Sequence, residues 1–76
     1  MKEKYNTAFV NVFGCDVSMV DSMKYQDSEG WDSIGHMNLI SELEDTFDIM
    51  FDTEDILAFD SYVHGIEILK RYGVEM

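Results

Sequence analysis

Apolar residues near the start of the chain recur at the spacing of an amphipathic helix. They are Tyr5, Ala8, Phe9, Val12 and Phe13, at positions i, i+3, i+4, i+7 and i+8. This spacing predicts a short helix with one buried face, and Gly14 is placed to end it. No period persists from Cys15 to Trp31, although that segment is rich in apolar residues. We therefore expect a long loop there that lies on the core.

The stretch from Ile34 to about Asp48 carries two stripes at helical spacing. The first stripe is apolar and consists of Leu39, Ile40, Leu43 and Phe47. The second lies about 135° away around the helix and consists of Ile34, Met37, Ser41, Glu44, Asp45 and Asp48. The first predicts a core face, whereas the second, apolar at its start and acidic further along, is typical of a docking surface. Alternatively, Ile34 and Met37 pack under the preceding loop.

Two shorter helices are predicted in the last third of the chain. The segment 52–59 opens with the cap candidates Asp52 and Thr53 and has acids in its first turn, where the helix dipole favours them. Asp60 and Ser61 open a last helix, which Gly73 closes. The expected apolar side of this helix consists of Tyr62, Val63, Ile66 and Leu69. Its C-terminal end is basic and contains Lys70 and Arg71. The pattern predicts an all-α fold: a small four-helix bundle with a long loop between the first two helices, forming one domain over residues 1–76.

The chain is strongly acidic. Its 76 residues include 16 Asp and Glu against 5 Lys and Arg, for a net charge of −11. Twelve of the carboxylates lie between Lys24 and Lys70, an interval without any other Lys or Arg. Such a surface opposes binding to nucleic acid and to anionic lipid headgroups, so we expect basic partners. No apolar run approaches the length of a membrane span, and the N-terminus has no signal-peptide core, which favours a cytoplasmic protein without membrane insertion.

Motifs that indicate an enzyme are missing from the sequence, which has no Gly-rich phosphate loop and no His-Glu-x-x-His. His36 falls on the apolar side of its helix and is interpreted as a packing residue, and His64 as a surface residue. The single Cys15 excludes an internal disulfide and is interpreted as a buried or bystander thiol. An EF-hand is not indicated, because the glycine of the segment 27–30 stands at the wrong spacing. We predict no catalytic residue and no metal site.

One short segment presents a serine where the long loop turns into the acidic helix. Asp32 and Ser33 are both strong N-cap types, so Asp32 can accept the N–H groups of the first turn while the Ser33 hydroxyl stays free for modification. A phosphodiester on that hydroxyl would lie near the positive end of the helix dipole, which favours an anion. Alternatively, the pair is a helix cap and nothing else.

Part of the sequence resembles the core of the acyl carrier protein family: Asp32-Ser33-Ile34, followed by Leu39, Ile40 and the run from Leu43 to Asp48. The resemblance extends over most of the chain. It implies a right-handed four-helix bundle in which Ser33 carries 4'-phosphopantetheine. A separate phosphopantetheinyl transferase attaches this arm from coenzyme A, and the terminal thiol of the arm holds acyl groups as thioesters. The resemblance also implies that the carrier itself catalyses nothing.

By the same resemblance, partner enzymes contact a set of positions that are here Ile34, Met37, Glu44 and Asp45; Asp48 extends the same acidic stripe. The chain departs from housekeeping fatty-acid carriers at Gly35 and Asn38, where acidic residues are frequent, and at Ser41, where a large apolar residue is usual. Trp31 before the Asp-Ser pair, with Gly-His after it, is similar to stand-alone carriers of specialised pathways, which include aminoacyl, polysaccharide-modifying and lipid systems. We expect a monomer that docks on acyl-loading and acyl-transferring enzymes with basic surfaces.

Two other classes fit the composition. An acidic binding protein without a prosthetic group could mimic a polyanion and dock on a basic partner. A small calcium-binding domain would bind the ion saturably, whereas a diffuse acidic surface would only screen it. The addition of an arm to Ser33 separates the carrier from both.

Overall fold

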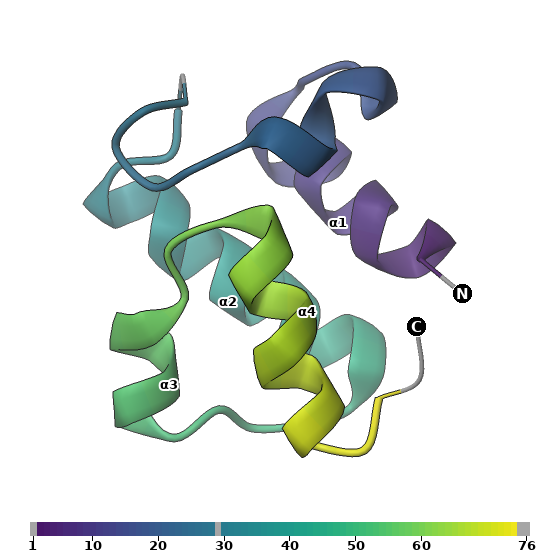
Figure 1. The fold of residues 1–76 in the computed structure, drawn as a ribbon, viewed down its shortest axis with the longest axis vertical. Coiled ribbons are helices and arrows are strands. Elements are labelled where there is room, and N and C mark those ends of the chain that lie inside the picture. Colours follow the sequence, from purple (N-terminus) through teal and green to yellow (C-terminus); the bar gives the residue numbers. More distant parts are fainter. Residues whose placement is uncertain (1, 29, 75–76) are drawn as a thin grey trace.

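A computed structural model describes residues 2–28 and 30–74 and is entirely helical in its regular structure (Figure 1). Its elements are α1 (Glu3–Phe13), the 3-10 helix η1 (Val17–Ser22), α2 (Ser33–Phe47), α3 (Thr53–Ala58) and α4 (Tyr62–Arg71). The prediction of an all-α fold is confirmed. The one pairing of strand type found in the described part of the chain is an isolated bridge between Lys24 and Ser61. None of the described helices has the length and apolar character that a bilayer crossing requires.

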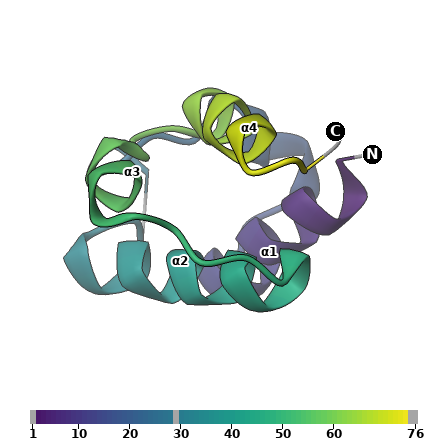
Figure 2. The same cartoon turned by 90° about the horizontal axis from the view of Figure 1, so that it is seen from below.

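The helices enclose one aromatic core. Figure 2 shows α1 and α2 along one side of the molecule and α3 and α4 along the other, an arrangement compatible with the predicted four-helix bundle. α1 contributes its predicted stripe, with Tyr5, Ala8 and Phe9 buried. Gly14 ends the helix as predicted, because it adopts a left-handed φ of 65° and returns its N–H to the carbonyl of Val10.

The segment predicted as one long loop contains a short 3-10 helix, and the structure is compatible with the predicted long connection between the first two α-helices. Asp16 starts η1 by accepting the N–H of Ser18 on its side chain. A 3-10 helix has about three residues per turn; here it buries Val20, and Met23 directly after it is buried as well. Met23 and Trp31 hold the connection to α2 against the core, and Trp31 is only 1% exposed.

The buried face of α4 is rotated from the predicted one. Tyr62 and Leu69 are buried as predicted, but Val63 is 62% exposed and Ile68 is fully buried in its place. The cause is Gly65, where an added Cβ would lie 2.2 Å from the Tyr5 hydroxyl oxygen and 2.3 Å from Cζ of Phe59. Only a residue without a side chain allows this approach, and the contact turns Gly65 and Ile68 inward and Val63 outward.

Candidate functional site

Ser33 is the first residue of α2, and its hydroxyl is accessible. Asp32 occupies the N-cap in an extended conformation, and its Oδ1 accepts the N–H of Gly35 at 2.9 Å. The prediction that Asp32 caps the helix is therefore confirmed. The exposed side chain of Ser33 has one described polar neighbour, the hydroxyl oxygen of Tyr25 at 3.4 Å, which is long for a hydrogen bond between hydroxyls.

The loop before α2 lies against the first turn of the helix through a contact between two glycines. A Cβ built on Gly35 would lie 1.9 Å from the carbonyl oxygen of Gly30, which itself has a φ of 85°. Backbone cannot withdraw from such an approach as a flexible side chain can, so the contact excludes every residue but glycine at position 35. This is a physical reason for the absence of an acidic residue two positions after Ser33.

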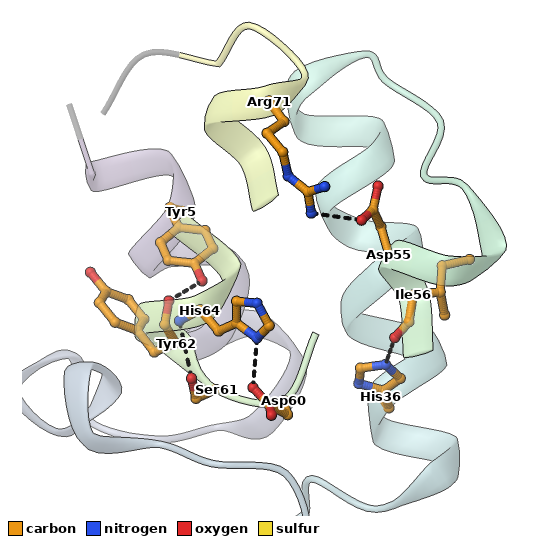
Figure 3. A network of polar contacts seen from close by, with 9 residues as sticks. All are labelled: Tyr5, His36, Asp55, Ile56, Asp60, Ser61, Tyr62, His64 and Arg71. Atoms are coloured by element: carbon orange, nitrogen blue, oxygen red, sulfur yellow. Dashed lines mark hydrogen bonds and ion pairs between the residues drawn. The ribbon is translucent and has the colours of Figure 1, made fainter. Parts of the chain in front are cut away.

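His36 joins the loop, α2 and α3 through both of its ring nitrogens. The indole Nε1–H of Trp31 donates to Nδ1 at 3.0 Å. Nε2 lies 2.7 Å from the carbonyl oxygen of Ile56, a contact that Figure 3 shows. Because indole nitrogen can only donate, Nδ1 accepts and Nε2 carries the proton that is donated to Ile56. His36 is 9% exposed, so its interpretation as a packing residue is confirmed. We call Trp31, His36 and Ile56 the His36 junction.

The second stripe of α2 faces solvent beside Ser33. Ile34 is 76% exposed and Met37 50% exposed, so the alternative that they pack under the loop is wrong. Asp45 and Asp48 are exposed too, whereas Glu44 is half-buried. The carboxylate of Glu44 accepts the backbone N–H of Phe51 at 2.9 Å and thereby anchors the segment after α2. Glu44 therefore has a structural role. The exposed stripe of α2 consists of Ile34, Met37, Ser41, Asp45 and Asp48.

α3 adds an exposed apolar residue that the sequence analysis missed. Leu57 is 78% exposed, while its neighbour Ile56 is half-buried and supplies the carbonyl of the His36 junction. In the six-residue α3 the tertiary structure turns Ile56 towards the core and Leu57 towards solvent. The sequence pattern gave no signal that separates the two.

The structure also places the remaining candidate residues. His64 is on the surface of α4, where its Nδ1 lies 2.9 Å from the carboxylate of Asp60 (Figure 3). Cys15 is half-buried, with its sulfur 3.6 Å from that of Met23. Within residues 2–28 and 30–74, no cluster of three or more His, Cys, Asp or Glu side chains is arranged to bind a metal ion.

The other end of α3 is attached to α4 by a carboxylate. Asp55 accepts hydrogen bonds from the Tyr72 hydroxyl at 2.6 Å and from Arg71 at 2.7 Å (Figure 3 shows the latter). The Tyr72 hydroxyl also accepts the N–H of Asp52, the N-cap residue of α3, whose own side chain makes no cap hydrogen bond. The hydrogen bond from Tyr72, and after it the charge of Arg71, hold the pKa of Asp55 below its ordinary value of 3.8.

Replacing Asp55 with asparagine is expected to lower the melting temperature at pH 7, and the loss should shrink in acid. Because the folded-state pKa is lowered, the ionised carboxylate stabilises the fold above pH 3.8, and this stabilisation disappears as the pH falls through the folded-state value. Thermal unfolding of both proteins at pH 7 and at about pH 3 measures the difference. Tyr72→Phe, which removes the principal donor, should act in the same direction; a deficit that persists unchanged in acid would contradict the assignment.

No family model, curated protein or solved structure matches the chain. Its function is therefore argued from the site: an accessible serine hydroxyl at a helix start, beside an exposed stripe that is apolar and then acidic.

Proposed function

We propose that this protein is a carrier of the acyl carrier protein type, in which Ser33 bears 4'-phosphopantetheine and the protein itself performs no catalysis. The observation that carries the proposal is that Asp32, not Ser33, caps α2. The hydroxyl of Ser33 is left exposed on the first turn. The arm supplies a thiol on which acyl or aminoacyl groups are held as thioesters.

The residues around Ser33 suit an attached phosphodiester. The phosphate would lie at the start of a helix of 15 residues, where the dipole and free N–H groups favour an anion. The side chain of Ser33 is exposed, so a modifying enzyme can reach the hydroxyl. Neither ring nitrogen of His36 is available as a base, because both are hydrogen-bonded within the fold. The chemistry of transfer therefore belongs to partner enzymes, with phosphopantetheinyl transferase as the first of them.

The test is the intact mass of the protein after incubation with coenzyme A, Mg²⁺ and a broad-specificity phosphopantetheinyl transferase. A carrier gains one arm per chain. The competing hypothesis, an acidic binding protein that mimics a polyanion, predicts an unchanged mass and tight binding to a basic partner without modification. An unchanged mass in a reaction that modifies a known carrier would refute the proposal.

Partner docking is assigned to the exposed stripe of α2, and a charge reversal tests it. Asp45 is exposed about 18 Å along the helix from Ser33. Asp45→Lys is expected to slow arm attachment about 3- to 10-fold at low salt, since surface charges act chiefly on the encounter of the partners. The rate should also become less dependent on ionic strength. Both quantities come from initial rates of arm attachment measured over a series of salt concentrations.

Glu67→Lys is the matched control for Asp45→Lys. It makes the same change in net charge at an exposed position of α4, on the side of the molecule opposite α2 (Figure 2). Its rate and salt dependence should stay close to those of the wild type. Equal effects of the two reversals would mean that only the net charge matters and that the α2 stripe is an ordinary solvated face.

A further inference from the structure

We infer that the carrier holds its cargo outside the helical bundle and that the cargo is a short or polar acyl or aminoacyl group, not a long aliphatic chain. The inference rests on the proposed carrier function. An apolar chain tethered at Ser33 either enters the protein core or stays in water. The side chains that fill the space beside Ser33 decide between the two.

The gap between α2 and α3 next to Ser33 is closed by the His36 junction. His36 donates to the carbonyl of Ile56 on α3 and accepts from the indole of Trp31, at 2.7 and 3.0 Å. A chain passing between the two helices would have to separate these groups. It would leave the Nε2–H of His36, a residue that is only 9% exposed, without its acceptor. Buried polar groups without partners are costly, so the junction opposes entry.

Aromatic rings fill the core behind the junction. The ring centroids of Trp31 and Phe59 lie 6.3 and 6.2 Å from that of His36, and the ring of Tyr25 lies 5.1 Å from it on the side of Ser33. Trp31 and Phe59 are each only 1% exposed. Protein interiors are packed as densely as organic crystals, so an entering chain would have to displace these rings.

The loop side offers no easier path, because the loop is in backbone contact with the helix at Gly35 and Gly30. Two hollows on the described surface do not lead between α2 and α3. One, of about 720 Å³, is lined by residues that include Phe47 and Ile49, about 21 Å along α2 from Ser33. The other, of about 230 Å³, lies between the end of α1 and η1. Neither is lined by a residue of α3 or of the first turns of α2.

A cargo that stays in water exposes its full surface, and exposed methylene groups are unfavourable in proportion to their area. The arrangement therefore suits groups of few carbons or groups with amino, hydroxyl or carboxyl substituents. The chain-length dependence of protein stability measures directly whether the cargo is buried.

The experiment loads Ser33 with acetyl, hexanoyl or decanoyl arms from the corresponding coenzyme A esters and compares melting temperatures. Burial would raise the melting temperature by about 3 to 6 °C for each buried methylene. We expect the three loaded proteins to have the same melting temperature. We also expect the indole N–H signal of Trp31 in NMR spectra to keep its chemical shift. Free decanoyl-coenzyme A added to Ser33→Ala protein provides the baseline for untethered binding.

The outcomes separate this inference from the proposed function. A melting temperature that climbs from acetyl to decanoyl, or a decanoyl arm that shifts the Trp31 signal, would overturn the inference and leave the carrier function intact. A chain that accepts no arm would overturn both. Equal melting temperatures and an unmoved Trp31 signal in fully loaded proteins support the inference.

Discussion

Ser33→Ala is expected to abolish attachment of the phosphopantetheine arm completely. The chain has other serines, but within the part that the structure describes Ser33 alone is an exposed hydroxyl at the first position of a long helix whose cap is supplied by its neighbour Asp32. Removing one hydroxyl oxygen from an exposed side chain leaves the Asp32 cap and the core contacts in place. Helical circular dichroism and melting temperature should therefore match the wild type within experimental error.

Ser41→Ala is the matched control, because Ser41 is exposed on the same helix within the α2 stripe. This variant should accept one arm per chain, as the wild type does. Peptide mapping of the modified protein should place the arm on the peptide that contains Ser33. Modification that survives in Ser33→Ala would show that another side chain is the acceptor.

Gly35→Ala is expected to destabilise the protein strongly, although alanine is the better helix former. The gain in helix propensity is about 1 kcal/mol. The opposing cost is a steric clash, because the new Cβ would lie 1.9 Å from the carbonyl oxygen of Gly30. Both sides of this contact are backbone, so the clash cannot be relieved by a side-chain rotation. Separating the loop from α2 also strains the cap bond of Asp32 and the bond from Trp31 to His36. We expect a net loss of about 3 kcal/mol or more in the free energy of unfolding.

Urea unfolding of wild type, Gly35→Ala and Gly14→Ala measures this effect. Gly14 has a φ of 65° and open space where a Cβ would stand, so Gly14→Ala isolates the conformational cost of a left-handed residue, about 1 kcal/mol. The arm should also attach more slowly to the folded fraction of Gly35→Ala, because the displaced loop carries Tyr25 and Trp31 beside the site. If Gly35→Ala proved as stable as the wild type, helix propensity would outweigh the contact and the loop would not be held there.

Much of the candidate site could be predicted from the sequence because it depends on residues close together in the chain. Helix capping acts over three positions, and the bond from Gly35 to Asp32 spans three. The two stripes of α2 follow from helical geometry, which places Leu39, Ile40 and Leu43 in the core and Ile34 and Met37 in solvent. The same projection placed His36 on the covered side.

Contacts between distant segments could not be predicted in this way. Glu44 and Asp45 look equivalent in the sequence, yet only the carboxylate of Glu44 accepts a backbone hydrogen bond, from Phe51 seven residues away. Asp55 is one carboxylate among many, and only the approach of α4 makes it the acceptor for Arg71 and Tyr72. Periodicity carries no information about which neighbour a side chain meets.

By itself, the sequence determined the helical class of the protein, its acidic character and the helix start that leaves Ser33 free, since these depend on composition, periodicity and capping within a few residues. Only the tertiary structure decided that Ile68 replaces Val63 in the core and that His36 bonds to Ile56 across twenty positions. It also decided that Gly35 meets Gly30 through backbone. The physical reason is that close packing selects one arrangement of whole helices, and that choice depends on the shapes of all the contacting surfaces together.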